Sequence, residues 1–127
     1  SKKFENNDIN VLKSQQKIVP DKIIFSRFEN IIKKMNTFVL NNNSELFFVY
    51  LPEFSRYSQK RTWDKYYNYK KIIEVVKDQN IKIIDLHKEL FEKTDDPLKY
   101  FPYRRFLHYN KQAYEEITDI IVNKIER

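Results

Sequence analysis

Two short apolar runs limit what this chain can fold into more than any other feature. Residues 46–51 read Leu-Phe-Phe-Val-Tyr-Leu, residues 81–86 read Ile-Lys-Ile-Ile-Asp-Leu, and Pro52 ends the first run. A short apolar run bounded by turn residues is typical of a strand that is buried on both faces of a parallel sheet. Such strands need neighbouring strands and covering helices, so the pattern predicts an α/β architecture.

Helices are predicted before, between and after these strands. Residues 22–41 carry apolar side chains at spacings of three and four, which predicts a helix with Asp21 as its N-cap. Residues 62–79, with Thr62 as the cap, are predicted to form the helix of a βαβ unit, and Asn110 is predicted to cap the last helix. The predicted inner face of the first helix consists of Ile24, Phe28, Ile31, Met35 and Phe38.

Two strands are too few to make a domain by themselves, because each needs partners on both sides. Residues 1–20 are polar without clear periodicity, residues 87–93 are predicted to form a short helix, and residues 94–109 are predicted to form a loop. We therefore expect further strands to come from a preceding segment or from another chain. Because an unpaired strand edge is prone to association, self-association into a homo-oligomer is also expected.

Composition narrows the class of protein. The chain of 127 residues is 41% hydrophobic and includes ten Phe and nine Tyr, which is enough for a packed core. It has no cysteine, and neither histidine has a partner at metal-ligand spacing, so no metal or cofactor is expected. No apolar run approaches the roughly 20 residues of a membrane span. The net charge of +6 is spread along amphipathic helices, which favours a solvated surface over a nucleic-acid partner.

The chain contains no glycine, although average usage would give about nine residues. Turns that need a left-handed backbone must therefore use another residue, and asparagine is the usual substitute. Asn41, Asn42 and Asn43 stand at the predicted end of the first helix. Sequence motifs that contain glycine in other proteins must also show a different residue here.

Candidate chemistry lies near the carboxyl ends of the strands, where ligands of open parallel sheets bind. His108 stands in a loop just before Asn110, and an imidazole there can take a proton from a nucleophile. A purely structural role in the turn is the alternative. His87, which follows the second strand, is interpreted as a helix-start residue.

A group of aromatic residues after Pro52 either stacks on a sugar or acyl group or packs against the sheet. This group consists of Phe54, Tyr57, Trp63, Tyr66 and Tyr67.

Four segments follow one another in a recognisable order. Residues 4–8 read Phe-Glu-Asn-Asn-Asp, residues 47–52 form an apolar strand ending in Leu-Pro, and residues 83–86 form a strand ending in Ile-Asp-Leu. Residues 108–110 read His-Tyr-Asn, and Ala113 and Tyr114 follow them. In this order the segments resemble the Gly-x-Asn-Asp block, the two later strands and the histidine block of SGNH (GDSL-type) hydrolases.

This resemblance implies that residues 1–127 are the C-terminal part of a single SGNH-hydrolase-like domain. The implied fold is a partial three-layer αβα flavodoxin-like fold with a parallel sheet, whose N-terminal strands are missing. The implied activity is that of a serine ester hydrolase, either a GDSL-type esterase or lipase or a carbohydrate acetylesterase. Such an enzyme acts by acyl transfer on an ester or acylated-carbohydrate substrate.

The resemblance also implies roles for particular residues. His108 would be the general base, and Asn7 would donate a hydrogen bond in the oxyanion hole. No serine of the chain stands in a Gly-Asp-Ser context, so the nucleophile is expected upstream of residue 1. The chain alone is therefore expected to be inactive.

One departure from the family pattern concerns the partner of the histidine. Arg105 stands three residues before His108, where the family has an aspartate that orients the imidazole. Three alternatives follow: a Ser-His dyad, a carboxylate borrowed from elsewhere, or a loss of activity. Asp95 and Asp96 lie in the same loop. The alternative function is a catalytically inactive domain that binds carbohydrate or a protein partner.

Overall fold

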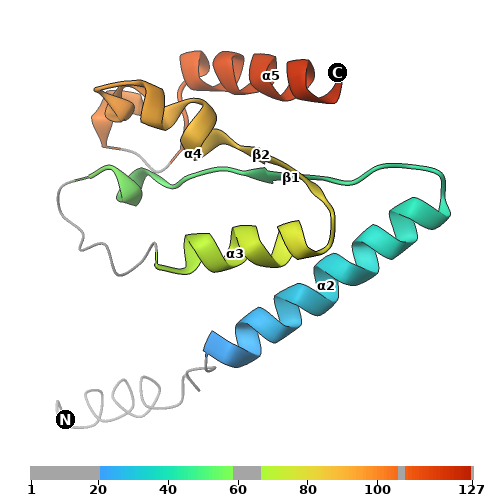
Figure 1. The fold of residues 1–127 in the computed structure, drawn as a ribbon. Helices are drawn as coiled ribbons and strands as arrows, with labels where there is room; N and C mark the ends of the chain where they lie inside the picture. Colours follow the sequence, from blue (N-terminus) through green and yellow to red (C-terminus); the bar gives the residue numbers. More distant parts are fainter. Residues whose placement is uncertain (1–20, 59–66, 106–107, 127) are drawn as a thin grey trace, which may run out of the picture.

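A computed structural model describes residues 21–58, 67–105 and 108–126 of the chain. Helices lie on both sides of a two-stranded sheet, with α5 on one side and α2 and α3 on the other (Figure 1). The helices are α2 (Asp21–Asn41), α3 (Tyr67–Asp78), α4 (Leu86–Glu89) and α5 (Lys111–Ile125), and the strands are β1 (Phe47–Tyr50) and β2 (Lys82–Asp85).

The two strands pair in parallel, with Phe47 opposite Lys82 and Tyr50 opposite Asp85. Helix α3 connects them, so the predicted βαβ unit and the α/β class are confirmed. Because the strands are parallel, both carboxyl ends meet at one edge of the sheet, on the left in Figure 1. The segments that follow β1 and β2 therefore begin side by side.

The larger core lies on the side of the sheet that α5 covers. Phe47 and Val49 of β1 point to this side, and Ile84 of β2 is almost fully buried there. The remaining buried residues come from α4, from the 3-10 turns that follow it and from α5. They are Leu86, Leu90, Phe91, Tyr100, Phe101, Ala113 and Ile117.

A smaller core lies on the opposite side, under α2 and α3. Ile32, Val76 and Ile81 are its buried residues. Phe28 of α2 meets Phe48 of β1 edge to face, with 6.2 Å between the ring centroids. Alternate residues of β1 thus face opposite cores, as the period of two in a strand requires.

The predicted inner face of α2 is wrong in most of its residues. Ile32 is the buried residue of the helix, and only Phe28 of the five predicted residues is half-buried. The other four are exposed by 50% (Ile24), 56% (Ile31), 46% (Met35) and 70% (Phe38). The apolar spacing correctly predicted a helix, but which side of it is covered depends on the neighbours it meets. Among the described residues these neighbours are α3 and the two strands.

The prediction that the strands are buried on both faces also needs correction. All four residues of β1 are half-buried, and Lys82 of β2 is exposed. Within the described residues β1 pairs only with β2, so its other edge has no neighbouring strand. Residues on an edge strand keep part of their surface in water even when helices lie above and below.

The segments between β2 and α5 agree in outline with the sequence. The predicted short helix at 87–93 is α4 followed by a 3-10 turn, Phe91–Lys93. The predicted loop at 94–109 contains two further 3-10 turns, Pro97–Tyr100 and Pro102–Arg104. The predicted cap Thr62 lies outside the described residues. None of the described helices combines the length and the apolar character that crossing a membrane requires.

Candidate functional site

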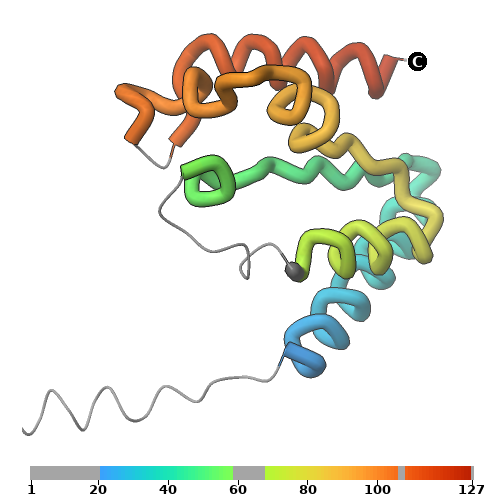
Figure 2. Tube along the Cα trace, turned by 60° about the vertical axis from the view of Figure 1, so that its left-hand side comes forward, coloured from blue at the N-terminus to red at the C-terminus, as the bar shows by residue number. Residues whose placement is uncertain are grey.

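Several polar side-chain contacts of the described structure lie at the carboxyl ends of β1 and β2. The 3-10 turn Phe54–Arg56 follows β1, α4 follows β2, and the N-terminus of α5 comes back to the same edge (Figures 1 and 2). Ligands of parallel sheets bind at this edge, because the chain leaves the sheet there and its loops can be shaped for function.

The loop that carries His108 is closed at its neck. The backbone N–H of Asn110 donates to the carbonyl of Tyr100 at 2.9 Å, and Asn110 Nδ2 donates to the carbonyl of Lys99 at 2.7 Å. The same asparagine caps α5, since its Oδ1 accepts from the N–H of Ala113 at 2.9 Å. The predicted cap is therefore confirmed, and it also joins the two ends of the loop, as in compact Ω-loops.

Tyr109 ties this loop to the end of β1. Its hydroxyl donates to the carbonyl of Pro52, the residue with which the Leu-Pro segment ends. Its ring packs against Phe101 and Phe91, with centroids 5.4 Å and 5.8 Å away. His108, the neighbouring residue, is exposed and has no hydrogen-bond or ion-pair partner among the residues that the structure describes. The bond of Tyr109 therefore ties the backbone next to His108 to the end of β1.

The carboxylates of the same loop do not orient His108. Asp96 accepts two hydrogen bonds from the guanidinium of Arg104, at 2.6 Å and 2.8 Å. These bonds hold the pKa of the Asp96 carboxyl below its usual value. Asp95 and Arg105 are exposed. Asp96 is thus already paired with Arg104 and is not the borrowed carboxylate that would orient His108.

Asn7, the predicted oxyanion-hole donor, lies in residues 1–20, outside the described part of the chain. Trp63 and Tyr66 of the aromatic group after Pro52 also lie outside it. Phe54 and Tyr57 of that group pack inward, since Phe54 contacts Phe101 edge to face at 5.3 Å and Tyr57 stacks on Phe91 at 5.1 Å. These two rings support the sheet edge.

His87 is the centre of a buried polar network that no sequence pattern indicates. It is 8% exposed, and both of its ring nitrogens have partners: the Tyr57 hydroxyl is 2.8 Å from Nδ1, and Glu92 Oε1 is 2.8 Å from Nε2. A carboxylate can only accept, so Nε2 of the neutral ring carries the proton and Nδ1 accepts from the tyrosine. Tyr57 and His87 are 30 positions apart in the sequence, so no local pattern could have indicated their contact.

Charges and burial keep this network in one protonation state. Burial, together with the nearby Arg56 guanidinium, lowers the pKa of His87. Burial also raises the pKa of the Tyr57 hydroxyl far above its usual value. The histidine therefore stays neutral and the tyrosine stays protonated around neutral pH.

A second set of contacts fixes the ends of both strands. The carboxylate of Asp85 accepts from the N–H of His87 at 3.1 Å, which caps α4, and from the hydroxyl of Tyr69. Arg56 donates to the Tyr50 hydroxyl at 3.2 Å and lies over the Tyr69 ring at 4.6 Å. The last residue of each strand is thus bonded to a neighbouring element.

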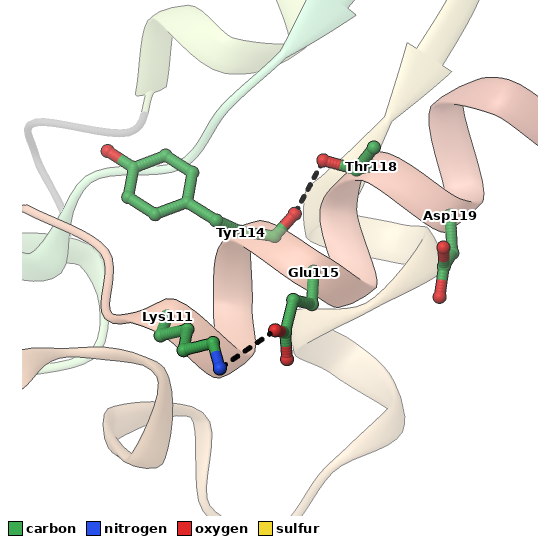
Figure 3. A pocket seen from close by; sticks show the side chains of 5 residues that line it. All are labelled: Lys111, Tyr114, Glu115, Thr118 and Asp119. Carbon is green, nitrogen blue, oxygen red and sulfur yellow. Dashed lines mark hydrogen bonds and ion pairs between the residues drawn. The ribbon is translucent and has the colours of Figure 1, made fainter.

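A hollow on α5 lies close to the same loop but offers little chemistry. Figure 3 shows that all five residues lining it come from α5 itself: Lys111, Tyr114, Glu115, Thr118 and Asp119. The Thr118 hydroxyl donates back to the Tyr114 carbonyl at 2.7 Å, and Lys111 pairs with Glu115 at 3.4 Å. Such contacts are usual on a solvated helix surface.

Comparison with known proteins gives no assignment: no family model matches this chain, no curated protein is significantly similar to it, and no solved structure matches its fold.

Proposed function

We propose that this chain is the C-terminal part of an SGNH-type serine ester hydrolase in which His108 is the general base. The observation that carries the proposal is the attachment of the His108 loop to the end of β1 through Tyr109 and Pro52. It brings two segments that resemble family motifs, the Leu-Pro strand end and the histidine block, to one edge of a parallel sheet. A loop histidine at this edge is well located for proton transfer.

Two features support the fold that belongs to this proposal: the exposed surface of α2, and the edge of β1 that has no partner strand among the described residues. Ile31 and Phe38 of α2 are exposed by 56% and 70%, and the residues of strand β1 are only half-buried. Further parallel strands beside β1 would cover this apolar surface and pair the free backbone edge. The complete domain would then be a three-layer flavodoxin-like fold, with the nucleophilic serine on one of those strands.

The proposed reaction is acyl transfer in two steps. The serine oxygen attacks the ester carbonyl while His108 takes the serine proton, and Asn7 donates a hydrogen bond to the resulting oxyanion. His108 then gives the proton to the departing alcohol, which leaves an acyl-serine. Water attacks this ester with His108 again as base, and the carboxylic acid and the free serine are regenerated. Since Arg105 stands in place of the aspartate, the histidine would act in a Ser-His dyad.

The test is hydrolysis of p-nitrophenyl acetate by the full-length protein and by its His108→Ala variant. A positioned general base contributes about 10²–10⁴-fold to the rate, so the variant is expected to lose activity by that factor. Its thermal midpoint should not change, because the side chain is exposed. If the folded parent protein shows no turnover above buffer, the proposal fails.

A second candidate is a catalytically inactive domain of the same type that binds carbohydrate or a protein partner. Arg105 favours it, as does the pairing of Asp96 with Arg104, because neither loop carboxylate is bonded to His108. Binding of an acetylated oligosaccharide that is unaffected by His108→Ala, with no turnover by either form, would favour this candidate over the enzyme.

A further inference from the structure

Helix α2 carries an apolar stripe that stays largely exposed in the described structure. The stripe consists of Ile24, Ile31, Met35 and Phe38, which share one side of the helix because they follow one another at multiples of three and four residues. Together with the half-buried Phe28, the spacings are four, three, four and three. This alternation is the pattern by which one helix packs along another.

The sheet is too narrow for the helices that lie on this side of it. Helices α2 and α3 are neighbours on the same face of two strands (Figures 1 and 2). A helix with its side chains is about 10 Å wide and neighbouring strands are about 4.8 Å apart, so two helices cover about four strands. A parallel strand added beside β1 also needs a covering helix of its own, and that helix would lie along α2.

The charges beside the stripe indicate what such a helix must carry. Phe28 and Ile32 border the stripe on its buried side, and Arg27 and Lys34 border it on the other side. Both cations are exposed, and neither has an ion-pair partner among the described residues. Glu29 lies on the side of α2 that faces α3, where it lines a groove. A partner on the stripe therefore meets positive charge only, and acidic side chains complement it.

The same charges argue against a second copy of the chain as the occupant. A two-fold interface brings the same patch of both copies together. Arg27 and Lys34 of one copy would then lie near the same two residues of the other copy, and like charges repel.

We propose that the apolar stripe of α2 is the docking surface for an amphipathic helix that precedes residue 1 in the same protein, and that acidic side chains of this helix pair with Arg27 and Lys34. The inference rests on the proposed function, because the strands placed beside β1 are what require this helix. It adds the chemistry of the segment that completes the fold, which is apolar on one face and acidic along its margin.

The first test treats the full-length protein with a water-soluble carbodiimide, which joins a lysine amine to a carboxylate in direct contact, and maps the linked peptides. We expect Lys34 to be linked to an aspartate or glutamate that precedes residue 1 in the same molecule. Lys34→Arg keeps the charge but lacks the reactive amine, so it should lose this product. A link from Lys34 only to a second, isotope-labelled copy, or no link to the preceding segment, would refute the proposal.

The second test compares two glutamine substitutions on α2 in the full-length protein. Ile31 and Leu40 are 56% and 58% exposed in the described structure, but they lie on opposite sides of the helix. Ile31→Gln should lower the thermal midpoint by about 5 °C or more, because a docked helix buries this side chain. Leu40→Gln is the matched control and should change it by about 2 °C or less.

Two results of this comparison would contradict the proposal. Equal midpoints of Ile31→Gln and Leu40→Gln would mean that nothing covers the stripe. Binding of the full-length protein to phosphatidylglycerol vesicles that Ile31→Gln abolishes would assign the stripe to an anionic membrane surface instead.

Hydrolysis of p-nitrophenyl acetate by the same samples separates this inference from the proposed function. If His108-dependent hydrolysis is observed while Lys34 is linked to no preceding carboxylate, the docking proposal fails and the proposed function stands. If the link and the effect of Ile31→Gln are found but the parent protein hydrolyses no ester, the docking surface stands and the catalytic proposal fails.

Discussion

The two histidines of this chain lie at the same end of the sheet and differ in burial and in hydrogen bonding. His87 is buried, and both of its ring nitrogens have partners in Tyr57 and Glu92. His108 is exposed, and within the described residues nothing is bonded to it. A ring whose two nitrogens are engaged can stabilise the fold but cannot take up a substrate proton without losing a hydrogen bond. An exposed ring on an anchored loop can do so.

This difference teaches that a histidine and the residues that anchor its loop can be separate: the loop of His108 is held by its neighbours in the sequence. Tyr109 and Asn110 make the bonds that hold the His108 loop, through the carbonyls of Pro52, Tyr100 and Lys99. His108 itself makes none of them. At the end of β2 the histidine is itself the anchor, because it joins the segment after β1 to the segment after α4.

The largest expected effect on stability is that of His87→Ala. The substitution leaves the Tyr57 hydroxyl without its partner and opens a cavity beside the rings of Tyr57 and Tyr69, so we expect a loss of about 3 kcal/mol in the free energy of unfolding. Tyr57→Phe keeps the ring stack and removes only one hydrogen bond, and should cost about 1–2 kcal/mol. Urea denaturation measures both. A loss below 0.5 kcal/mol for His87→Ala would show that the network does not stabilise the fold.

The dependence of stability on pH gives the next largest effect. Because burial and Arg56 lower the pKa of His87, the folded state binds fewer protons than the unfolded state just below the ordinary histidine pKa of about 6.5. Stability should therefore fall as pH decreases from about 6.5 to the folded-state pKa, by at most about 1.4 kcal/mol per pH unit.

His87→Gln is the matched control for this prediction, because it removes the titrating group and should flatten the curve in that window. Carboxylates such as Glu89 and Glu116, whose pKa values are lowered by their partners Lys124 and Tyr100, act in a separate window below about pH 4.5. A slope between pH 6.5 and 5 that is identical in the parent protein and in His87→Gln would contradict the assignment.

A smaller effect is expected at the neck of the His108 loop. Asn110→Ala removes the cap of α5 and the bond to Lys99, and should cost about 1 kcal/mol. Asn123→Ala, an exposed position within the same helix, is the control and should be neutral or slightly stabilising, because alanine has the higher helix propensity. Equal thermal midpoints for the two variants would mean that Asn110 does not anchor the loop.

The smallest effect on stability is that of His108→Gln. An exposed side chain without bonded partners should change the free energy of unfolding by less than about 0.5 kcal/mol. Chemical denaturation of the variant beside His87→Gln gives the difference directly. A destabilisation of His108→Gln as large as that of His87→Gln would remove the distinction between the two sites.

The features that the sequence predicted correctly are those that a few neighbouring residues determine. The strands at Phe47–Tyr50 and Lys82–Asp85 follow from continuous apolar runs, and the Asn110 cap follows from one side chain beside a helix start. The side on which α2 is covered could not be predicted in this way. Ile31 and Ile32 are adjacent in the sequence, and the position of α3 and β1 decides that Ile32 is buried and Ile31 is exposed.

The candidate site was predictable to a similar degree. The pattern around His108 identified the loop, but its attachment to Pro52 spans 57 positions in the sequence and depends on the fold. The network of His87 with Tyr57 and Glu92 depends on the fold in the same way. The left-handed backbone of Tyr103 and Arg104 was not predictable either, because neither residue type is typical of that conformation.

The most direct test of the division between the two histidines is to compare ester hydrolysis by His108→Gln and His87→Gln in the full-length protein. Rates of p-nitrophenyl acetate hydrolysis are divided by the folded fraction of each sample, so that lost stability is not counted as lost catalysis. We expect His108→Gln to lose about 10²–10⁴-fold in rate and His87→Gln to keep nearly the full rate per folded molecule. A full rate in His108→Gln, or an equal loss in both variants, would contradict the assignment of His108 as the base.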